Sequence, residues 1–301
     1  MSRGWRVYYN VVFGGIGGLI AWMIVGSLPD LIQNALFWEL LTGALAGASI
    51  GGFLGAVDGA LGKRWERMMI GALRGGALGF FGGIIGLAIG EGVFLLTQGG
   101  VLGRSIGWGL VGAVIGTTEG IANRAPRKVS YGVLGCTLGG LVGGALFEGL
   151  TQAALSFAPS SATFDPQLVM RMQTAAAALG LTLVGACIGS LIALVEGVLV
   201  KAWLKVIRGK QEGKDFNVVK SEMTIGGDDG NDIPVYDPNV GRKFIVLRQH
   251  GKEIRVENAG GTASFIRAGT NQPIPIAKSQ TLDDGDKIQV GNTLLLFHQR
   301  K

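Results

Sequence analysis

Long stretches of apolar residues alternate with short polar breaks through the first two thirds of the chain. A helix needs about 20 mostly apolar residues to cross the hydrocarbon of a bilayer. Six stretches reach or approach that length, at about 10–28, 36–61, 69–97, 105–122, 130–156 and 173–203. The pattern therefore predicts an α-helical polytopic membrane domain of six transmembrane helices, with the fourth helix the shortest.

The pattern changes near residue 208. Short runs that read as strands follow one another, separated by turn residues, which is typical of an all-β sandwich. These runs lie at 222–225, 233–236, 243–248, 253–257, 264–267, 287–290 and 293–298. The sequence thus predicts a glycine-rich membrane domain over 1–208, a charged linker over 209–215 and a β-sandwich over 216–301.

The charge distribution indicates an orientation for the predicted membrane domain. Residues 1–208 carry 14 Lys/Arg and 9 Asp/Glu. The basic residues cluster before the first span, after the sixth and in alternate breaks between spans. Loops rich in Lys and Arg face the cytoplasm. We therefore expect both termini in the cytoplasm, an even number of spans and a multi-pass protein in contact with the lipid bilayer.

Glycine patterns recur within the predicted spans and indicate an internal repeat. Glycines followed by a Glu-Gly pair occur at 82–92 and again 57 residues later at 139–149, and one seven-residue template recurs at 45–51, 110–116 and 183–189. We interpret the six spans as three helical hairpins derived from one. Glycines spaced three or four apart let neighbouring backbones approach closely. This glycine zipper predicts a compact bundle, and it is compatible with a homo-oligomer or a larger membrane complex.

Five of the acidic residues inside or at the ends of these spans precede a glycine. They are Asp58, Glu91, Glu119, Glu148 and Glu196. An ionisable group within a span costs at least ~2.5 kcal/mol at mid-depth and is a functional candidate. One interpretation is a cation or proton path with carboxylates at both ends. The other, which we favour, is structural: acids close to span ends reach the headgroup zone, a repeat duplicates them whether or not they are used, and a carboxylate before a glycine can also cap or brace a neighbouring helix end.

Four segments of the C-terminal part resemble forkhead-associated (FHA) domains. They are Thr224-Ile225-Gly226, Asn231-Asp232-Ile233, Gly260-Gly261-Thr262 and the sequence LDDGDKIQVG at 282–291. The last is the most specific, because it matches the family's L-x-x-G-D-x-I-x-[IV]-G hairpin. The resemblance implies a β-sandwich that binds a protein partner, in the family a phosphothreonine peptide, through the loops at one end.

The phosphate-binding positions of that family are only partly present. Its Gly-Arg is Gly226-Gly227 here, its Ser-Arg-x-His is 241–244 with the sequence GRKF, and its Asn-Gly-Thr is 260–262 with the sequence GGT. The candidate partner-binding or phosphopeptide-binding residues implied by the resemblance are Arg242, Lys243, Gly261 and Thr262. A phosphate site that lacks an Arg and a Ser loses charge-assisted hydrogen bonds. We therefore expect partner binding without full phosphothreonine recognition, with ordinary recognition as the alternative.

The sequence contains no pattern typical of an enzyme. Neither a nucleophile with a base, a His/Cys metal cluster nor a phosphate-binding loop is recognisable, so we expect no catalysis, no cofactor and no metal. The tail carries a net charge of +1, which argues against nucleic acid as a partner. The favoured hypothesis is a membrane-anchored scaffold or adaptor that recruits a cytoplasmic protein. The alternative is an ion or proton channel or transporter regulated by the FHA-like domain.

Overall fold

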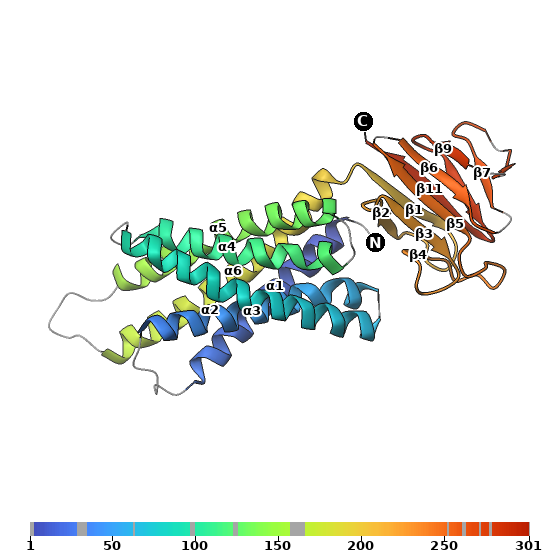
Figure 1. The fold of residues 1–301 in the computed structure, drawn as a ribbon. Helices are drawn as coiled ribbons and strands as arrows, with labels where there is room; N and C mark the ends of the chain where they lie inside the picture. Colours follow the sequence, from blue (N-terminus) through green and yellow to red (C-terminus); the bar gives the residue numbers. More distant parts are fainter. Residues whose placement is uncertain are drawn as a thin grey trace. The chain divides into compact units, whose positions relative to one another are not determined.

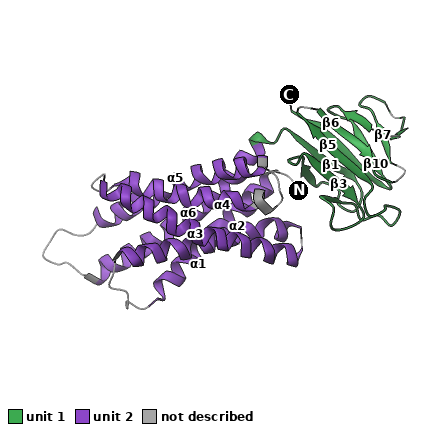
Figure 2. Cartoon of the chain, in the orientation of Figure 1, with its two compact units in different colours: residues 1–3, 198–301 green, residues 4–197 purple. Residues whose placement is uncertain are grey.

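The structure is a computed structural model. It describes residues 3–28, 35–62, 64–96, 100–122, 126–156, 166–251, 253–260, 263–270, 272–276 and 279–300. The chain divides into two compact units, shown in different colours in Figure 2: residues 4–197, and residues 198–301 together with residues 1–3.

The first unit is helical. Its helices are α1 (Arg3–Gly26), α2 (Ala35–Leu61), α3 (Trp65–Leu96), α4 (Val101–Ala122), α5 (Pro126–Ser156) and α6 (Pro166–Leu199) (Figure 1). Within the described residues, all of these except α4 are long and apolar enough to cross a membrane. The six predicted helices are therefore present, and the fourth is the shortest, as expected. The number of membrane passes and the orientation of the termini stay predictions.

Each helix contacts the next one, and α6 returns to α1, so the helices form a closed ring. The closest approaches are Gly17 with Ile50, Gly47 with Gly79, Gly86 with Val111, Gly112 with Cys136, Gly139 with Ile188, and Gly185 with Gly14. Apolar side chains from all six helices fill the centre, including Ala21, Ile50, Leu87, Val111, Cys136 and Ile188. Dispersion between closely packed backbones is what holds helices together where lipid supplies no hydrophobic drive.

The three copies of the seven-residue template make matching contacts. The third residue of each template, Gly47, Gly112 or Gly185, lies against the following odd-numbered helix or, for the last copy, against α1. The sixth residue of each, Ile50, Ile115 or Ile188, is buried in the core. The origin of the helices as three hairpins from one stays a prediction, and these contacts agree with it.

The second unit is a sandwich of two β-sheets. Its strands are β1 (Ala202–Arg208), β2 (Asp215–Asn217), β3 (Glu222–Gly226), β4 (Ile233–Pro234), β5 (Ile245–His250), β6 (Glu253–Asn258), β7 (Ser264–Ile266), β8 (Ile274–Pro275), β9 (Ser279–Leu282), β10 (Lys287–Val290) and β11 (Thr293–Gln299). One sheet has the order β2-β1-β11-β10-β7-β8 and the other β4-β3-β5-β6-β9. The sheets enclose a core that includes Leu204, Ile225, Leu247, Phe265 and Phe297.

The sandwich begins earlier than the sequence analysis expected. Residues 202–208, assigned to the end of the membrane domain, form β1, which pairs with both β2 and β11. Residues 209–215, expected to be a linker, are the turn between β1 and the start of β2. The alternating burial of Ala202, Leu204 and Val206 is the period of a strand. Strand β1 directly follows the apolar stretch of α6, so the sequence analysis assigned its residues to the membrane domain.

The segment 282–291 forms a turn and a hairpin fixed by one buried carboxylate. Asp286 is fully buried. Its two oxygens accept hydrogen bonds from the backbone N–H of Ala268 and of Asp283, both at 2.8 Å. Gly291 then turns the chain with a φ of +57° between the paired residues Val290 and Thr293, a conformation that favours glycine. Asp286 thus joins the start of β10 to the loop after β7.

Replacing Asp286 by alanine is expected to lower the free energy of unfolding of the C-terminal unit by about 2–4 kcal/mol. The change leaves two backbone N–H groups without their acceptor, and each unsatisfied buried group costs ~1–3 kcal/mol. Urea unfolding of residues 200–301 measures the loss. Glu253→Ala is the matched control, because its side chain is 62% exposed and pairs with Arg255 two residues away. Equal losses in both variants would contradict the assigned role of Asp286.

Candidate functional site

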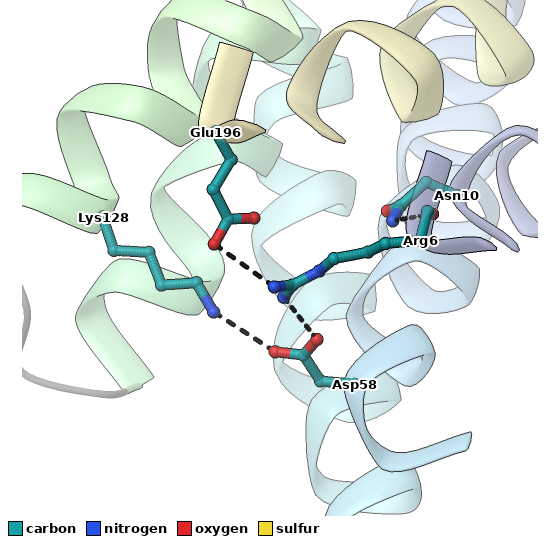
Figure 3. A network of polar contacts seen from close by, with 5 residues as sticks. All are labelled: Arg6, Asn10, Asp58, Lys128 and Glu196. Atoms are coloured by element: carbon teal, nitrogen blue, oxygen red, sulfur yellow. Dashed lines mark hydrogen bonds and ion pairs between the residues drawn. The ribbon is translucent and has the colours of Figure 1, made fainter. Parts of the chain in front are cut away.

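Charged side chains from four helices meet where α1 begins and α2 ends (Figure 3). Arg6 of α1 lies 2.8 Å from Asp58 Oδ1 and 3.5 Å from Glu196 Oε1 through its two Nη atoms. Lys128 of α5 lies 3.2 Å from Asp58 Oδ2. Two cations and two carboxylates therefore link α1, α2, α5 and α6, and we name them the Arg6 network.

Two of the four side chains of the Arg6 network are shielded from solvent. The side chains of Glu196 and Lys128 are 9% and 10% exposed, whereas that of Asp58 is 43% exposed. Glu196 and Lys128 also line a small pocket with Tyr131 and Ile192. An ion pair in such a place stabilises only when both partners stay together, because either charge alone loses hydration without compensation.

A second charged group lies toward the other end of the helices, where α2 and α4 begin. Arg104 of α4 pairs with Glu39 of α2, and its Nε is 3.8 Å from Oε2 of Glu148 on α5. Gln152 donates a hydrogen bond of 3.0 Å to the other oxygen of Glu148. The carboxyl of Glu91 on α3 faces Glu39. We name these residues the Arg104 network.

The structure thus gathers the predicted carboxylates into two groups: Asp58 with Glu196, and Glu91 with Glu148. The side chain of Glu119 lies outside the described residues. Their charged partners Arg6, Lys128, Glu39 and Arg104 were missed as site residues. In sequence, Arg6 and Lys128 belong to the basic clusters that flank the spans, and nothing in those clusters marks them as partners of the carboxylates.

Three loops of the sandwich gather at one end: 227–232, 235–244 and the turn at Gly291-Asn292. The amide of Asn231, which is 5% exposed, donates hydrogen bonds to the carbonyl of Asp228 at 2.8 Å and to that of Arg242 at 2.5 Å. Asn231 therefore holds the first loop against the second. The sequence analysis included Asn231 in a segment that resembles FHA domains, but not among the candidate site residues.

Asp237 joins the second loop to the turn at Asn292. Its carboxylate accepts backbone hydrogen bonds from Asn292 at 2.6 Å and from Asn239 at 3.0 Å. Both bonds hold the pKa of Asp237 below its usual range, and the bond from Asn292 has the larger effect. The loop end is therefore braced by side-chain to backbone bonds at Asn231 and Asp237.

Comparison with known proteins bears on this second unit. Residues 205–301 match the model of the Yop-YscD cytoplasmic domain family, described as the cytoplasmic domain of an inner membrane component of the type III secretion system (T3SS). Residues 205–301 form an FHA-like domain. The match begins inside β1, in agreement with the early start of the sandwich.

Solved FHA domains are also similar to this chain. One from a Chlamydia trachomatis protein is 21% identical, with 34% of this chain and 99% of that chain covered and a TM-score of 0.30. One from Arabidopsis thaliana is 21% identical, with 35% and 89% covered and a TM-score of 0.30. That of human APLF, in complex with an XRCC1 bisphosphopeptide, is 17% identical, with 33% and 99% covered and a TM-score of 0.29. No curated protein matches the chain.

The candidate binding residues of the FHA-like domain lie at its loop end, as far as they are described. Arg242 and Lys243 are exposed on the second loop. The Nζ of Lys243 is 3.9 Å from Glu222 Oε1. Gly261 and Thr262 lie outside the described residues. The first loop, held against Arg242 by Asn231, presents the exposed acids Asp228 and Asp229.

Proposed function

We propose that the protein is a membrane-anchored adaptor whose FHA-like domain binds a cytoplasmic protein partner at its loop end. The observation that carries the proposal is the match of residues 205–301 to the cytoplasmic domain of an inner membrane component of the T3SS. Two further observations support it. The preceding helices have the length and composition of membrane spans, and the FHA-like domain has a core of its own.

We also propose that this binding does not require phosphothreonine. A phosphate carries about −1.5 to −2 charges at neutral pH and binds where several cationic donors converge. Here Arg242 lies beside a loop that carries Asp228 and Asp229, and Lys243 already pairs with Glu222. The local charge therefore favours a mixed-charge protein surface over a phosphorylated one.

The packing of the helical unit supports anchoring rather than transport. Buried apolar side chains from all six helices fill the centre of the ring. Asp58, Glu148 and Glu196 each lie within 4 Å of an Arg or Lys. A paired carboxylate holds its counter-ion and leaves less charge to attract a mobile cation. We therefore interpret both networks as braces between helices.

Capture of lysate proteins by immobilised residues 200–301 tests the proposed function. We expect a set of bound proteins that survives phosphatase treatment of the lysate and that falls at least about tenfold with Arg242→Glu/Lys243→Glu, since reversing two interface charges costs more than ~1.4 kcal/mol. Quantitative mass spectrometry reads out the bound set.

The matched control reverses two charges that do not contact Lys243 or its partner Glu222. Arg255 pairs with Glu253 on β6 and Arg267 pairs with Asp283, and both are exposed, so Arg255→Glu/Arg267→Glu should leave capture within about twofold. Loss of the bound proteins after phosphatase treatment would instead establish phosphate recognition. Equal loss in both charge-reversed variants would remove the loop end as the binding site.

A further inference from the structure

One face of the FHA-like domain is both apolar and basic, and we propose that it docks on the anionic lipid headgroups of the membrane that holds the helices. The face is the outer side of the sheet containing β1, β10 and β11. Its central residues are Trp203, Lys205, Lys287, Leu294 and Leu296, which we name the basic–apolar face. The alternation of burial along β1, β10 and β11 turns these side chains away from the core.

The strand pairing brings these side chains together. Trp203 is opposite His298, and Lys205 is opposite Leu296, which is in turn opposite Lys287. The rings of Trp203 and His298 stack with centroids 5.1 Å apart, and the guanidinium of Arg300 lies 5.7 Å from the Trp203 ring. Tryptophan beside cations is the composition that favours the boundary between headgroups and acyl chains.

The outer side of the other sheet has a different character. Glu222 lies 3.6 Å from Arg248, which is 3.5 Å from Glu257, and Arg255 lies 3.3 Å from Glu253. These charges compensate one another, and the pairing of β3, β5 and β6 places them side by side. The two faces of the same sandwich therefore differ in both apolarity and net charge.

The charge of the basic–apolar face favours an anionic membrane surface over a second copy of this chain as its binding partner. A second copy would bring Lys205, Lys287 and Arg300 against their own kind, which is unfavourable in a symmetric interface. Two acids border this face, Asp215 opposite Lys205 on β2 and Asp284 at 3.5 Å from His298. The cations Lys205, Lys287 and Arg300 outnumber them. An anionic surface is complementary, and the cytoplasmic leaflet is such a surface, worth about 1 kcal/mol for each Lys or Arg near it.

The short chain connection limits how far the start of β1 can lie from the end of α6. α6 ends at Leu199 and β1 begins at Ala202, so the intervening chain spans at most about 11 Å when extended. Residues of β1 therefore start near the end of the last helix. This step rests on the proposed membrane anchoring, whereas the affinity of the face for lipid can be measured without the helices.

The first test uses residues 200–301, which form a unit with their own core and contain a single tryptophan, Trp203. We expect binding to phosphatidylglycerol/phosphatidylcholine vesicles, with a blue shift of Trp203 emission that weakens at high salt. The variant Lys205→Gln/Lys287→Gln should bind about 30-fold more weakly. The control Arg248→Gln/Arg255→Gln, which removes the same charge from the other face, should change binding less than about threefold.

The second test uses the full chain in nanodiscs, with Cys136 and Cys187 replaced by alanine and one environment-sensitive dye attached. A dye at Gln289→Cys, beside the basic–apolar face, should shift to the blue when phosphatidylglycerol replaces phosphatidylcholine. A dye at Thr281→Cys, on the other sheet, should not shift.

Three results would overturn the proposal. Absence of both vesicle binding and the dye shift excludes lipid as the occupant. Equal loss of vesicle binding in Lys205→Gln/Lys287→Gln and in Arg248→Gln/Arg255→Gln shows that binding is not confined to this face. Dimerisation of residues 200–301 without vesicles, abolished by Lys205→Gln/Lys287→Gln, assigns the face to a second copy. None of these results bears on the capture of a protein partner by the loop end that carries Arg242, so the proposed function is tested separately.

Discussion

Replacing Gly47 by leucine is expected to destabilise the helical unit by at least about 3 kcal/mol. Gly47 of α2 and Gly79 of α3 face each other so closely that a Cβ on either would collide with the carbonyl group of the other. The same mutual approach recurs at Gly43 with Gly83 and at Gly51 with Gly75. A backbone carbonyl in a helix cannot move aside as a flexible side chain can, so the two helices must separate.

Unfolding of the detergent-solubilised protein by sodium dodecyl sulfate, followed by circular dichroism, measures this loss. Gly92→Leu is the matched control. Gly92 lies in the neighbouring helix α3, and nothing lies within 4 Å of a Cβ built there, so that leucine should cost less than about 1 kcal/mol. Similar losses at Gly47 and Gly92 would show that helix propensity, rather than close approach, explains the glycine content.

Replacing Arg6 by glutamine is expected to have the second largest effect, a loss of about 2–4 kcal/mol in the stability of the helical unit. Arg6 is the cation between Asp58 and Glu196. Its removal leaves the shielded Glu196 beside a second carboxylate, and an uncompensated buried charge costs ~3–5 kcal/mol. The partial exposure of Asp58 reduces that figure.

A second substitution separates charge compensation from packing. In the Arg6→Gln background, Glu196→Gln should recover at least half of the lost stability, because it removes the charge that lost its partner. Arg171→Gln is the control. Arg171 is an exposed residue of α6, so its replacement should be nearly neutral. If Glu196→Gln adds to the damage instead, the Arg6 network is held together by shape rather than by charge.

Hydropathy and glycine spacing were enough to predict the six helices, because both are local properties of the sequence. The start of the sandwich was not predicted. Val200 and the apolar residues of β1 continue the apolar run of α6, and Lys201, Lys205 and Arg208 were interpreted as the basic residues that end the sixth span. The strands β2 and β8 were missed for another reason, since three or two residues are too few to show a period.

The candidate sites were predicted in part. The acids stood out because they lie inside apolar stretches, whereas Arg6 and Lys128 were interpreted as residues that orient the helices in the membrane, and Arg104 was not singled out. Their pairing depends on which helices become neighbours in the ring, and that is a property of the tertiary fold. Asn231 was missed because its role comes from a contact with the carbonyl of Arg242, eleven residues away.

Partner capture by the full chain in vesicles tests the central claim most directly. Three proteins are compared: the unaltered chain, Arg242→Glu/Lys243→Glu in the FHA-like domain, and Arg6→Gln/Glu196→Gln in the helical unit. We expect the first variant to lose partner capture at least about tenfold and the second to retain it, with cation and proton flux through the vesicles the same in all three. Capture that is unchanged by the loop variant, together with flux that is altered by the helical variant, would contradict the adaptor account and establish a transport function.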